Sequence, residues 1–210
     1  MNQPYFPAAS LVLVAASLAF AGTGDPPDEV VRSESKPVTV NDAQFVVVTE
    51  ATWRIPKPGA DDTEVSTEIR IRNLAKADQL FHTMDAYAPT ITTADGKYLA
   101  RKSGGRRFTC YTEPERAALG KACSIRPWFS LQWDDKAKAG TLVYEDGTGW
   151  KEVWSPMRPG RYALGFLYST ENRKRIAGYE LMDKGKGIDT SGAWTGRVLT
   201  GDAPFEVIGP

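Results

Sequence analysis

Residues 63–72 read TEVSTEIRIR, a stretch in which β-branched and polar side chains alternate without a break. The β-branched residues occupy every odd position, and the polar residues occupy every even position. A period of two is typical of a β-strand that buries one face, whereas an amphipathic helix repeats its apolar residues every three to four positions. The stretch therefore predicts a strand with these inward side chains: Thr63, Val65, Thr67, Ile69 and Ile71.

The same alternation recurs elsewhere in the chain. Turn-forming residues at 94–97 (ADGK) and 146–149 (DGTG) separate neighbouring runs, as two antiparallel hairpins require. Helical composition is confined to residues 113–121 (EPERAALGK), which predict one short helix at most. The pattern therefore predicts an all-β, antiparallel sandwich or barrel with long loops. Its further inward sets are Phe45, Val47, Ala51 and Trp53; Phe129, Leu131 and Trp133; and Tyr162, Leu164, Phe166 and Tyr168.

Residues 159–166 (PGRYALGF) run from a turn into a strand whose first inward residue is Tyr162. This arrangement resembles the tyrosine corner of immunoglobulin-like β-sandwich domains, in which the tyrosine hydroxyl bonds to the backbone a few residues upstream. The resemblance implies an immunoglobulin-like or fibronectin III-type sandwich, with residues 194–198 and 205–207 as its last strand pair. Leu164 stands where antibody domains carry a cysteine, so no disulfide between the sheets is implied. One fold serves many functions, and the resemblance therefore implies no activity.

The N-terminal segment has the pattern of an export signal. Residues 8–21 (AASLVLVAASLAFA) carry no charge and end in an Ala-x-Ala triplet, which predicts a signal peptide over residues 1–21. The run is shorter than the 18 or so apolar residues that an uncleaved membrane anchor needs. We expect a flexible linker over residues 22–40, a single domain over residues 41–210, and no transmembrane segment after cleavage. The mature protein is expected to be exported: periplasmic, on the cell surface or secreted.

The chain has only two cysteines, Cys110 and Cys123. They lack the Cys-x-x-Cys spacing and the histidine neighbours of a redox or zinc site, and the expected compartment is oxidising. We therefore predict that they form a disulfide, which would make residues 101–127 a disulfide-tied loop insertion. Closing so short a loop is worth about 3 kcal/mol in the chain-entropy model.

Basic residues gather in the same segment, although the whole chain balances 26 basic against 26 acidic groups. A net charge of zero argues against binding to nucleic acid or to an anionic membrane. The cluster of Arg101, Lys102, Arg106 and Arg107 predicts a basic patch that could hold an acidic polymer or an envelope protein. A solvated loop with compensating acids is the alternative interpretation.

The positions of four tryptophans indicate a second kind of binding surface. Trp150 and Trp154 would share one face of a strand, and Trp128 and Trp194 lie where exposure is expected. Exposed indole rings could stack on the sugar rings of a polysaccharide. Burial in the core is the competing explanation, because large rings in a domain of this size mostly pack inside.

Residues for catalysis are sparse. His82 is the only histidine, and no nucleophile elbow, phosphate loop, dinucleotide fingerprint or EF-hand loop occurs. The paired carboxylates at 61–62 and 134–135 could bind calcium or act as hydrolase acids, although adjacent acids are commonly solvated turn residues. We therefore expect no catalytic residues, metal site or cofactor. The predicted function is a non-enzymatic binding or accessory module, with a carbohydrate-binding module, or less favoured a carboxylate-based hydrolase, as the alternatives.

Overall fold

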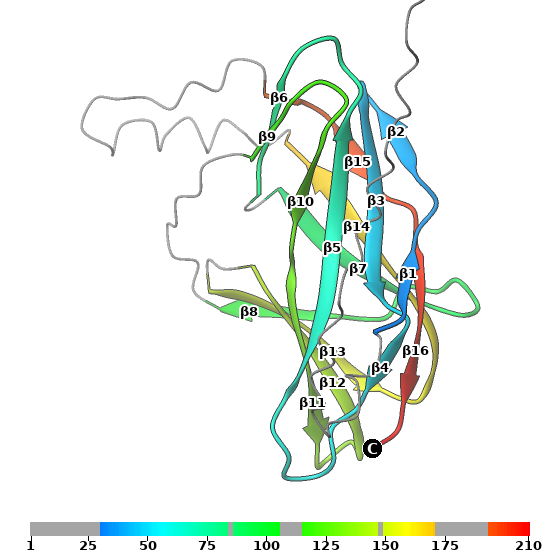
Figure 1. The fold of residues 1–210 in the computed structure, drawn as a ribbon. Coiled ribbons are helices and arrows are strands. Elements are labelled where there is room, and N and C mark those ends of the chain that lie inside the picture. Colours follow the sequence, from blue (N-terminus) through cyan, green and yellow to red (C-terminus); the bar gives the residue numbers. More distant parts are fainter. Residues whose placement is uncertain (1–29, 84–85, 106–114, 147–148, 171–192) are drawn as a thin grey trace, which may run out of the picture.

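The computed structural model describes residues 30–83, 86–105, 115–146, 149–170 and 193–210. In these ranges the chain forms sixteen β-strands and no helix (Figure 1). Nine strands make a first sheet and five make a second, and nearly all their pairings are antiparallel. The predicted all-β sandwich class is thereby confirmed. A short third sheet pairs β6 (Gln79–Phe81) with β9 (Glu115–Ala117).

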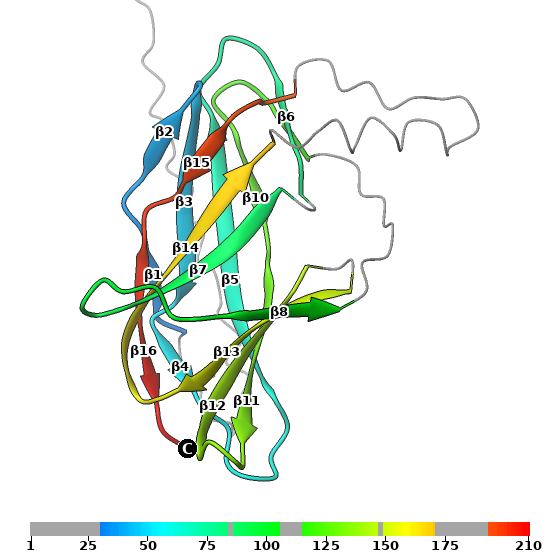
Figure 2. The ribbon, with the colours of Figure 1, turned by 180° about the vertical axis from the view of Figure 1, so that it is seen from behind.

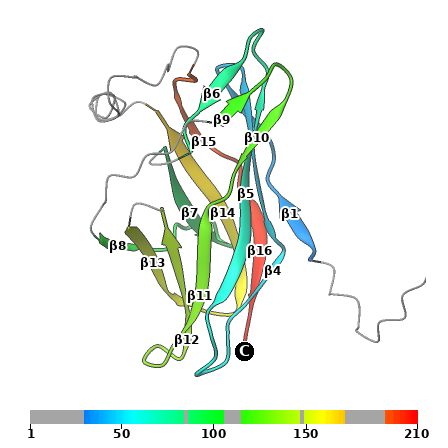
Figure 3. The ribbon, with the colours of Figure 1, turned by 60° about the vertical axis from the view of Figure 1, so that its left-hand side comes forward.

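The first sheet has the strand order β1-β3-β5-β11-β12-β13-β8, with β2 paired to β3 and β10 paired to β5. Figure 3 shows β8 at one edge of this sheet and β1 at the other. Its strands are β1 (Arg32–Glu34), β2 (Val38–Val40), β3 (Ala43–Glu50), β5 (Thr63–Asn73), β8 (Lys102–Gly105), β10 (Ala122–Ile125), β11 (Trp128–Asp134), β12 (Ala139–Glu145) and β13 (Trp150–Met157).

The second sheet has the order β15-β14-β16-β4, with β7 paired to β14. Figure 2 shows β14 and β7 crossing the long strands β3 and β5 diagonally. The pairing of β4 with β16 is parallel, whereas the other pairings of this sheet are antiparallel. Its strands are β4 (Thr52–Arg54), β7 (Tyr87–Thr93), β14 (Gly160–Ser169), β15 (Arg197–Leu199) and β16 (Ala203–Ile208).

Strand β5 confirms the alternation that predicts the fold. Val65, Thr67, Ile69 and Ile71 are buried, and the polar residues between them lie toward solvent. Apolar residues of β14 are buried in the same phase at Leu164, Phe166 and Tyr168, as predicted. Burying one face of each strand against the other sheet removes these side chains from water, and that transfer stabilises the sandwich.

Aromatic contacts join the two sheets. Phe45 on β3 lies 5.3 Å from Tyr168 on β14, measured between ring centroids. Phe129 on β11 lies 6.2 Å from Phe166 on β14. All four rings are fully buried, so the core lies between the first and second sheets.

Both predicted hairpins are present. Strands β12 and β13 pair antiparallel around residues 146–149, of which 147–148 lie outside the described residues. At residues 94–97, Thr93 donates its backbone N–H to the Lys97 carbonyl, and Thr92 bridges to Tyr98. Gly96 has φ of +78°, a conformation that glycine adopts without steric cost.

Three sequence predictions differ from the structure in the described residues. Part of the predicted linker forms β1 and β2, because both strands pair with the edge of β3. The predicted loop over 101–127 contains β8, β9 and β10, and the helix expected at 113–121 is replaced by β9 and a turn. Strand β9 pairs with β6, β8 with β13 and β10 with β5. These pairings give the backbone N–H and C=O groups of the segment hydrogen-bond partners in neighbouring strands, whereas a helix would supply them within the segment.

The predicted strand over residues 44–53 is divided between the two sheets. Strand β3 ends at Glu50 in the first sheet, and β4 begins at Thr52 in the second. At the crossing residue, the Ala51 carbonyl accepts a hydrogen bond from Glu206, and its N–H donates to Val31. The backbone thus keeps its hydrogen bonds while it changes sheet.

The tyrosine at the start of β14 makes the predicted hydrogen bond. Its hydroxyl donates to the carbonyl of Arg158 at 2.9 Å, four residues upstream, and its ring lies 5.7 Å from that of Phe205. We expect Tyr162→Phe to lower the free energy of unfolding by about 1 kcal/mol, because one hydrogen bond is lost and the ring packing is kept. Urea denaturation measures this difference. The control is Tyr98→Phe, whose ring is 65% exposed, and an equal loss in both variants would contradict a role for the Tyr162 hydroxyl.

Candidate functional site

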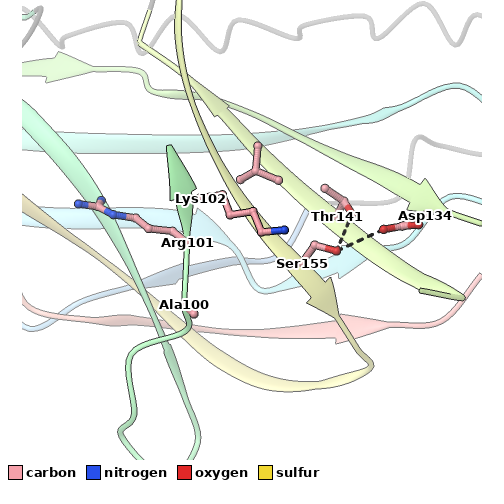
Figure 4. A pocket seen from close by; sticks show the side chains of 7 residues that line it. Ala100, Arg101, Lys102, Asp134, Thr141 and Ser155 are labelled. Atoms are coloured by element: carbon pink, nitrogen blue, oxygen red, sulfur yellow. Dashed lines mark hydrogen bonds between the residues drawn. The ribbon is translucent and has the colours of Figure 1, made fainter. Parts of the chain in front are cut away.

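An open pocket of about 300 Å³ lies at the β8 end of the first sheet (Figure 4). Leu142 and Trp154 are the strand neighbours of its lining residues, and both belong to the core. The pocket therefore lies on the face of the first sheet that points away from the second sheet. The strands that form it are β8, β11, β12 and β13, with residues 100–101 leading into β8. Its lining residues are Ala100, Arg101, Lys102, Asp134, Thr141, Val153 and Ser155.

Strand register brings these side chains together. Val153 on β13 stands opposite Lys102 on β8, so both project from the same face. The register between β12 and β13 shifts at a β-bulge, where two residues of β13, Ser155 and Pro156, stand opposite the single residue Thr141 of β12. Such a bulge redirects side chains at the point where it occurs. Here it places the Ser155 hydroxyl beside that of Thr141.

A chain of polar groups crosses the pocket (Figure 4). The hydroxyl oxygens of Thr141 and Ser155 are 3.1 Å apart, and Ser155 Oγ lies 3.4 Å from Asp134 Oδ2. Asp134 Oδ1 accepts the backbone N–H groups of Lys136 and Ala137 at 2.9 and 3.1 Å. These two backbone hydrogen bonds are the main reason that the pKa of Asp134 lies below its ordinary value. Asp134 therefore presents an ionised carboxylate that orients Ser155 at neutral pH.

The two basic residues of this site have different roles. Arg101 donates from Nη1 to Glu152 Oε2 at 2.7 Å and to the Pro89 carbonyl at 3.1 Å. The Glu152 side chain is 8% exposed, so this ion pair lies largely out of water. Lys102 instead extends toward Ser155 (Figure 4) and forms no salt bridge with any described residue. Among the described lining residues, Lys102 is thus the cation without a salt bridge.

The predicted basic patch is therefore divided. Arg101 and Lys102 are adjacent in sequence, yet the charge of Arg101 is directed to Glu152 and that of Lys102 to the pocket. Arg106 and Arg107 lie outside the described residues. Arg101 and Lys102 therefore do not form a continuous cationic surface, because the Glu152 carboxylate neutralises the charge of Arg101.

The predicted tryptophan surface is wrong for two of its four members. Trp154 is 1% exposed and Trp194 is 2% exposed, so neither ring can stack on a ligand. Glu152 and Trp154 belong to the inward phase of β13, and the Trp194 ring packs 5.3 Å from Phe45. Trp150 is half-buried at the start of β13. Trp128, by contrast, is 46% exposed on β11.

The predicted disulfide between Cys110 and Cys123 is not formed in the structure. Cys123 is a buried free thiol on β10 in the structure, and Cys110 lies outside the described residues. Burial, and secondly the nearby charge of Glu115, raise the pKa of the Cys123 thiol to about 11. A thiol with this pKa is almost entirely protonated at neutral pH, which makes it a poor nucleophile as it stands.

Catalytic candidates do not converge on the pocket. Asp134 is the one carboxylate among the described residues that line it, whereas a glycoside hydrolase needs two acids flanking the bond. Asp62 and Asp135 accept hydrogen bonds from Gln132 and Trp133, respectively. His82 is buried elsewhere, and its backbone carbonyl accepts the Tyr168 hydroxyl. Within the described ranges, no three His, Cys, Asp or Glu side chains are grouped so that they could hold a metal ion.

Sequence reasoning missed the hydroxyl groups of this site. Thr141 and Ser155 are polar residues beside the inward residues Leu142 and Trp154, and that alternation indicates that they face outward. The bulge that pairs them leaves no comparable signal in the sequence.

Across the part of the chain that the structure describes, no helix is both long and apolar enough to cross a membrane.

We compared the chain with known proteins at three levels. Protein-family models, curated protein sequences and solved structures gave no significant match.

Proposed function

We propose that this chain is an exported, non-enzymatic, immunoglobulin-like β-sandwich that binds a polar ligand at the pocket of Lys102, Thr141 and Ser155. The observation that carries the proposal is the ordered chain of hydroxyl and carboxylate groups on β11, β12 and β13 beside an ammonium group. Side chains held on paired strands lose little freedom when a ligand binds, so they suit recognition.

Three further observations support parts of this proposal. The hydrogen bond from Tyr162 to Arg158 matches the tyrosine corner, which supports an immunoglobulin-like type of sandwich. Residues 1–21 have the composition of a signal peptide, which supports export. A single carboxylate among the lining residues favours binding over acid–base hydrolysis.

Export is tested by expressing the full chain and measuring the intact mass of the protein outside the cytoplasm. We expect the mass of residues 22–210. The full-length mass, found only in the cytoplasmic fraction, would contradict export.

Ligand binding is tested with Ser155→Ala, which removes the central hydroxyl of the pocket. Soluble oligogalacturonate, cello-oligosaccharide and poly-L-glutamate are titrated by calorimetry, and we expect about a tenfold loss of affinity for whichever probe binds. Ser124→Ala on β10 is the matched control, because Ser124 also donates to a carboxylate, that of Glu68. Equal loss in the two variants, or no binding of any probe, would contradict the proposed site.

A carbohydrate-binding module is the second candidate function. The specific observation in its favour is that the exposed ring of Trp128 lies on the same face of the same sheet as the pocket.

A further inference from the structure

The outward face of the first sheet carries more than the pocket. Trp128 on β11 stands opposite Ser66 on β5 and Glu145 on β12, in the phase opposite to the buried Phe129. Leu142 and Tyr144 on β12 belong to the core. Thr141 and Val143 alternate with them along the strand and therefore point to the opposite, outward face. The exposed indole and the pocket therefore lie on the same face of the sheet, with Ser130 and Val143 between them only 6% and 8% exposed.

Two cross-strand rows connect the indole to the pocket. The first row runs from Trp128 through Glu145 and Lys151, which form a salt bridge, to Gly104. The row beside it runs from Ser130 through Val143 and Val153 to Lys102. The salt bridge neutralises the charges of the first row, and Gly104 adds no side chain at its end. In the second row Val153 is the partly exposed apolar side chain, and the row ends at the ammonium group of Lys102.

Sheet geometry gives the length of this surface. Lys102 and Trp128 are three strand spacings apart across the sheet, about 14 Å, and two residues apart along it, about 7 Å. The diagonal between them is thus about 16 Å. A single small molecule in the pocket does not reach the indole, whereas a chain of several linked units does.

The chemistry along this line matches a sugar chain. A pyranose ring has an apolar C–H face that packs on an indole ring or on valine methyl groups, and hydroxyl groups around its edge. Thr141, Ser155, Asp134 and Lys102 offer both donors and acceptors for such hydroxyl groups. Lys102 additionally offers a positive charge to a carboxylate. An extended polypeptide would share the apolar contacts, but its backbone groups prefer a strand edge to a sheet face.

We propose that the outward face from Trp128 to the Lys102–Ser155 pocket binds an oligosaccharide that lies across strands β11, β12, β13 and β8. One sugar ring stacks on Trp128, the middle of the chain lies over the Glu145–Lys151 salt bridge and Val153, and the far end bonds to the hydroxyl groups and Lys102 in the pocket. This proposal rests on the proposed binding function and adds the class of ligand and its orientation. A longer oligosaccharide contacts both ends and therefore binds more tightly than a shorter one.

The test is calorimetry with the mature protein and two glycan series. Cello-oligosaccharides supply a neutral sugar chain, and oligogalacturonates supply one with carboxylates; each is used as a dimer and as a hexamer. We expect the hexamer to bind at least tenfold more tightly than the dimer. Trp128→Ala should weaken hexamer binding about tenfold and leave dimer binding in the pocket nearly unchanged. Lys102→Gln should weaken the acidic hexamer more than the neutral one.

Matched controls separate these effects from general changes in the protein. Tyr98→Ala removes another exposed aromatic ring, and Lys36→Gln removes an exposed lysine near the opposite edge of the sheet. Neither should change glycan affinity. Equal affinity for dimer and hexamer, or a Trp128 variant that binds like wild type, would overturn the oligosaccharide proposal. Binding of poly-L-glutamate alone, lost in Ser155→Ala, would also overturn it while supporting the pocket as a binding site.

Discussion

Replacing Trp53 by alanine is expected to lower the free energy of unfolding by about 3–5 kcal/mol, the range for removing a buried aromatic side chain. Trp53 is 1% exposed, and its ring stacks on Phe205 at 3.7 Å between centroids. It also lies 6.2 Å from Phe129, which belongs to the other sheet. The indole N–H donates to Thr49 and to the Glu50 carbonyl. One side chain therefore joins β4 to both layers of the core.

Urea denaturation measures this loss, and the melting temperature should fall by about 10 °C for a domain of this size. The matched control is Trp128→Ala, the same substitution at a ring that is 46% exposed. Trp128→Ala should cost less than about 1 kcal/mol, because its ring remains partly in water before the change. If the two variants unfold at the same urea concentration, Trp53 does not occupy the core as described.

The same region shows what a sequence period can and cannot predict. The alternation of residues 44–53 predicts a strand with Trp53 inward, and Trp53 is inward. The period continues through Ala51, however, where the chain leaves the first sheet for the second. A residue can stay in phase with its neighbours while its backbone changes hydrogen-bond partners. The partner here is Glu206, which is remote in the sequence.

Strand β13 shows a second limit of sequence-based reasoning. Its inward phase contains Glu152 between two tryptophans, and a glutamate in a strand ordinarily indicates a solvent-facing side. The structure buries Glu152 because Arg101 supplies the opposite charge from 51 residues away. A local pattern does not contain that pairing. Trp154, in the same phase, is buried in the core, which is the alternative to an exposed binding surface that the sequence left open.

The candidate site depends on register even more strongly. Lys102, Thr141 and Ser155 come from three strands, and only the alignment of β8, β12 and β13 places them together. A shift of one residue would turn each of these side chains to the other face. Trp128 and Lys102 were each predicted as binding residues from the sequence, but as parts of separate surfaces. The structure places them on one face of one sheet.

Replacing Arg101 by methionine is expected to lower the free energy of unfolding by about 2–4 kcal/mol, because it leaves the Glu152 carboxylate in the interior without this cation. The Glu152 side chain is 8% exposed, whereas that of Arg101 is 41% exposed, which places the expected loss below that for a fully buried pair. Arg101 also donates to the Pro89 carbonyl on β7 of the second sheet. Its loss therefore weakens a connection between the sheets as well as an ion pair.

A double-mutant cycle distinguishes the ion pair from general packing. Arg101→Met, Glu152→Gln and the double variant are unfolded in urea, and we expect the double variant to be more stable than the sum of the single losses predicts, by about 1–2 kcal/mol. Lys102→Gln is the control for charge, because it removes an adjacent lysine that faces the pocket and should change stability by less than about 0.5 kcal/mol. Additive losses would show that Arg101 stabilises the fold through its packing and its hydrogen bond to Pro89, and not through Glu152. A positive coupling energy would establish that Glu152 is tolerated inside the sandwich because Arg101 neutralises it, and that this ion pair holds the segment leading into β8 against the interior.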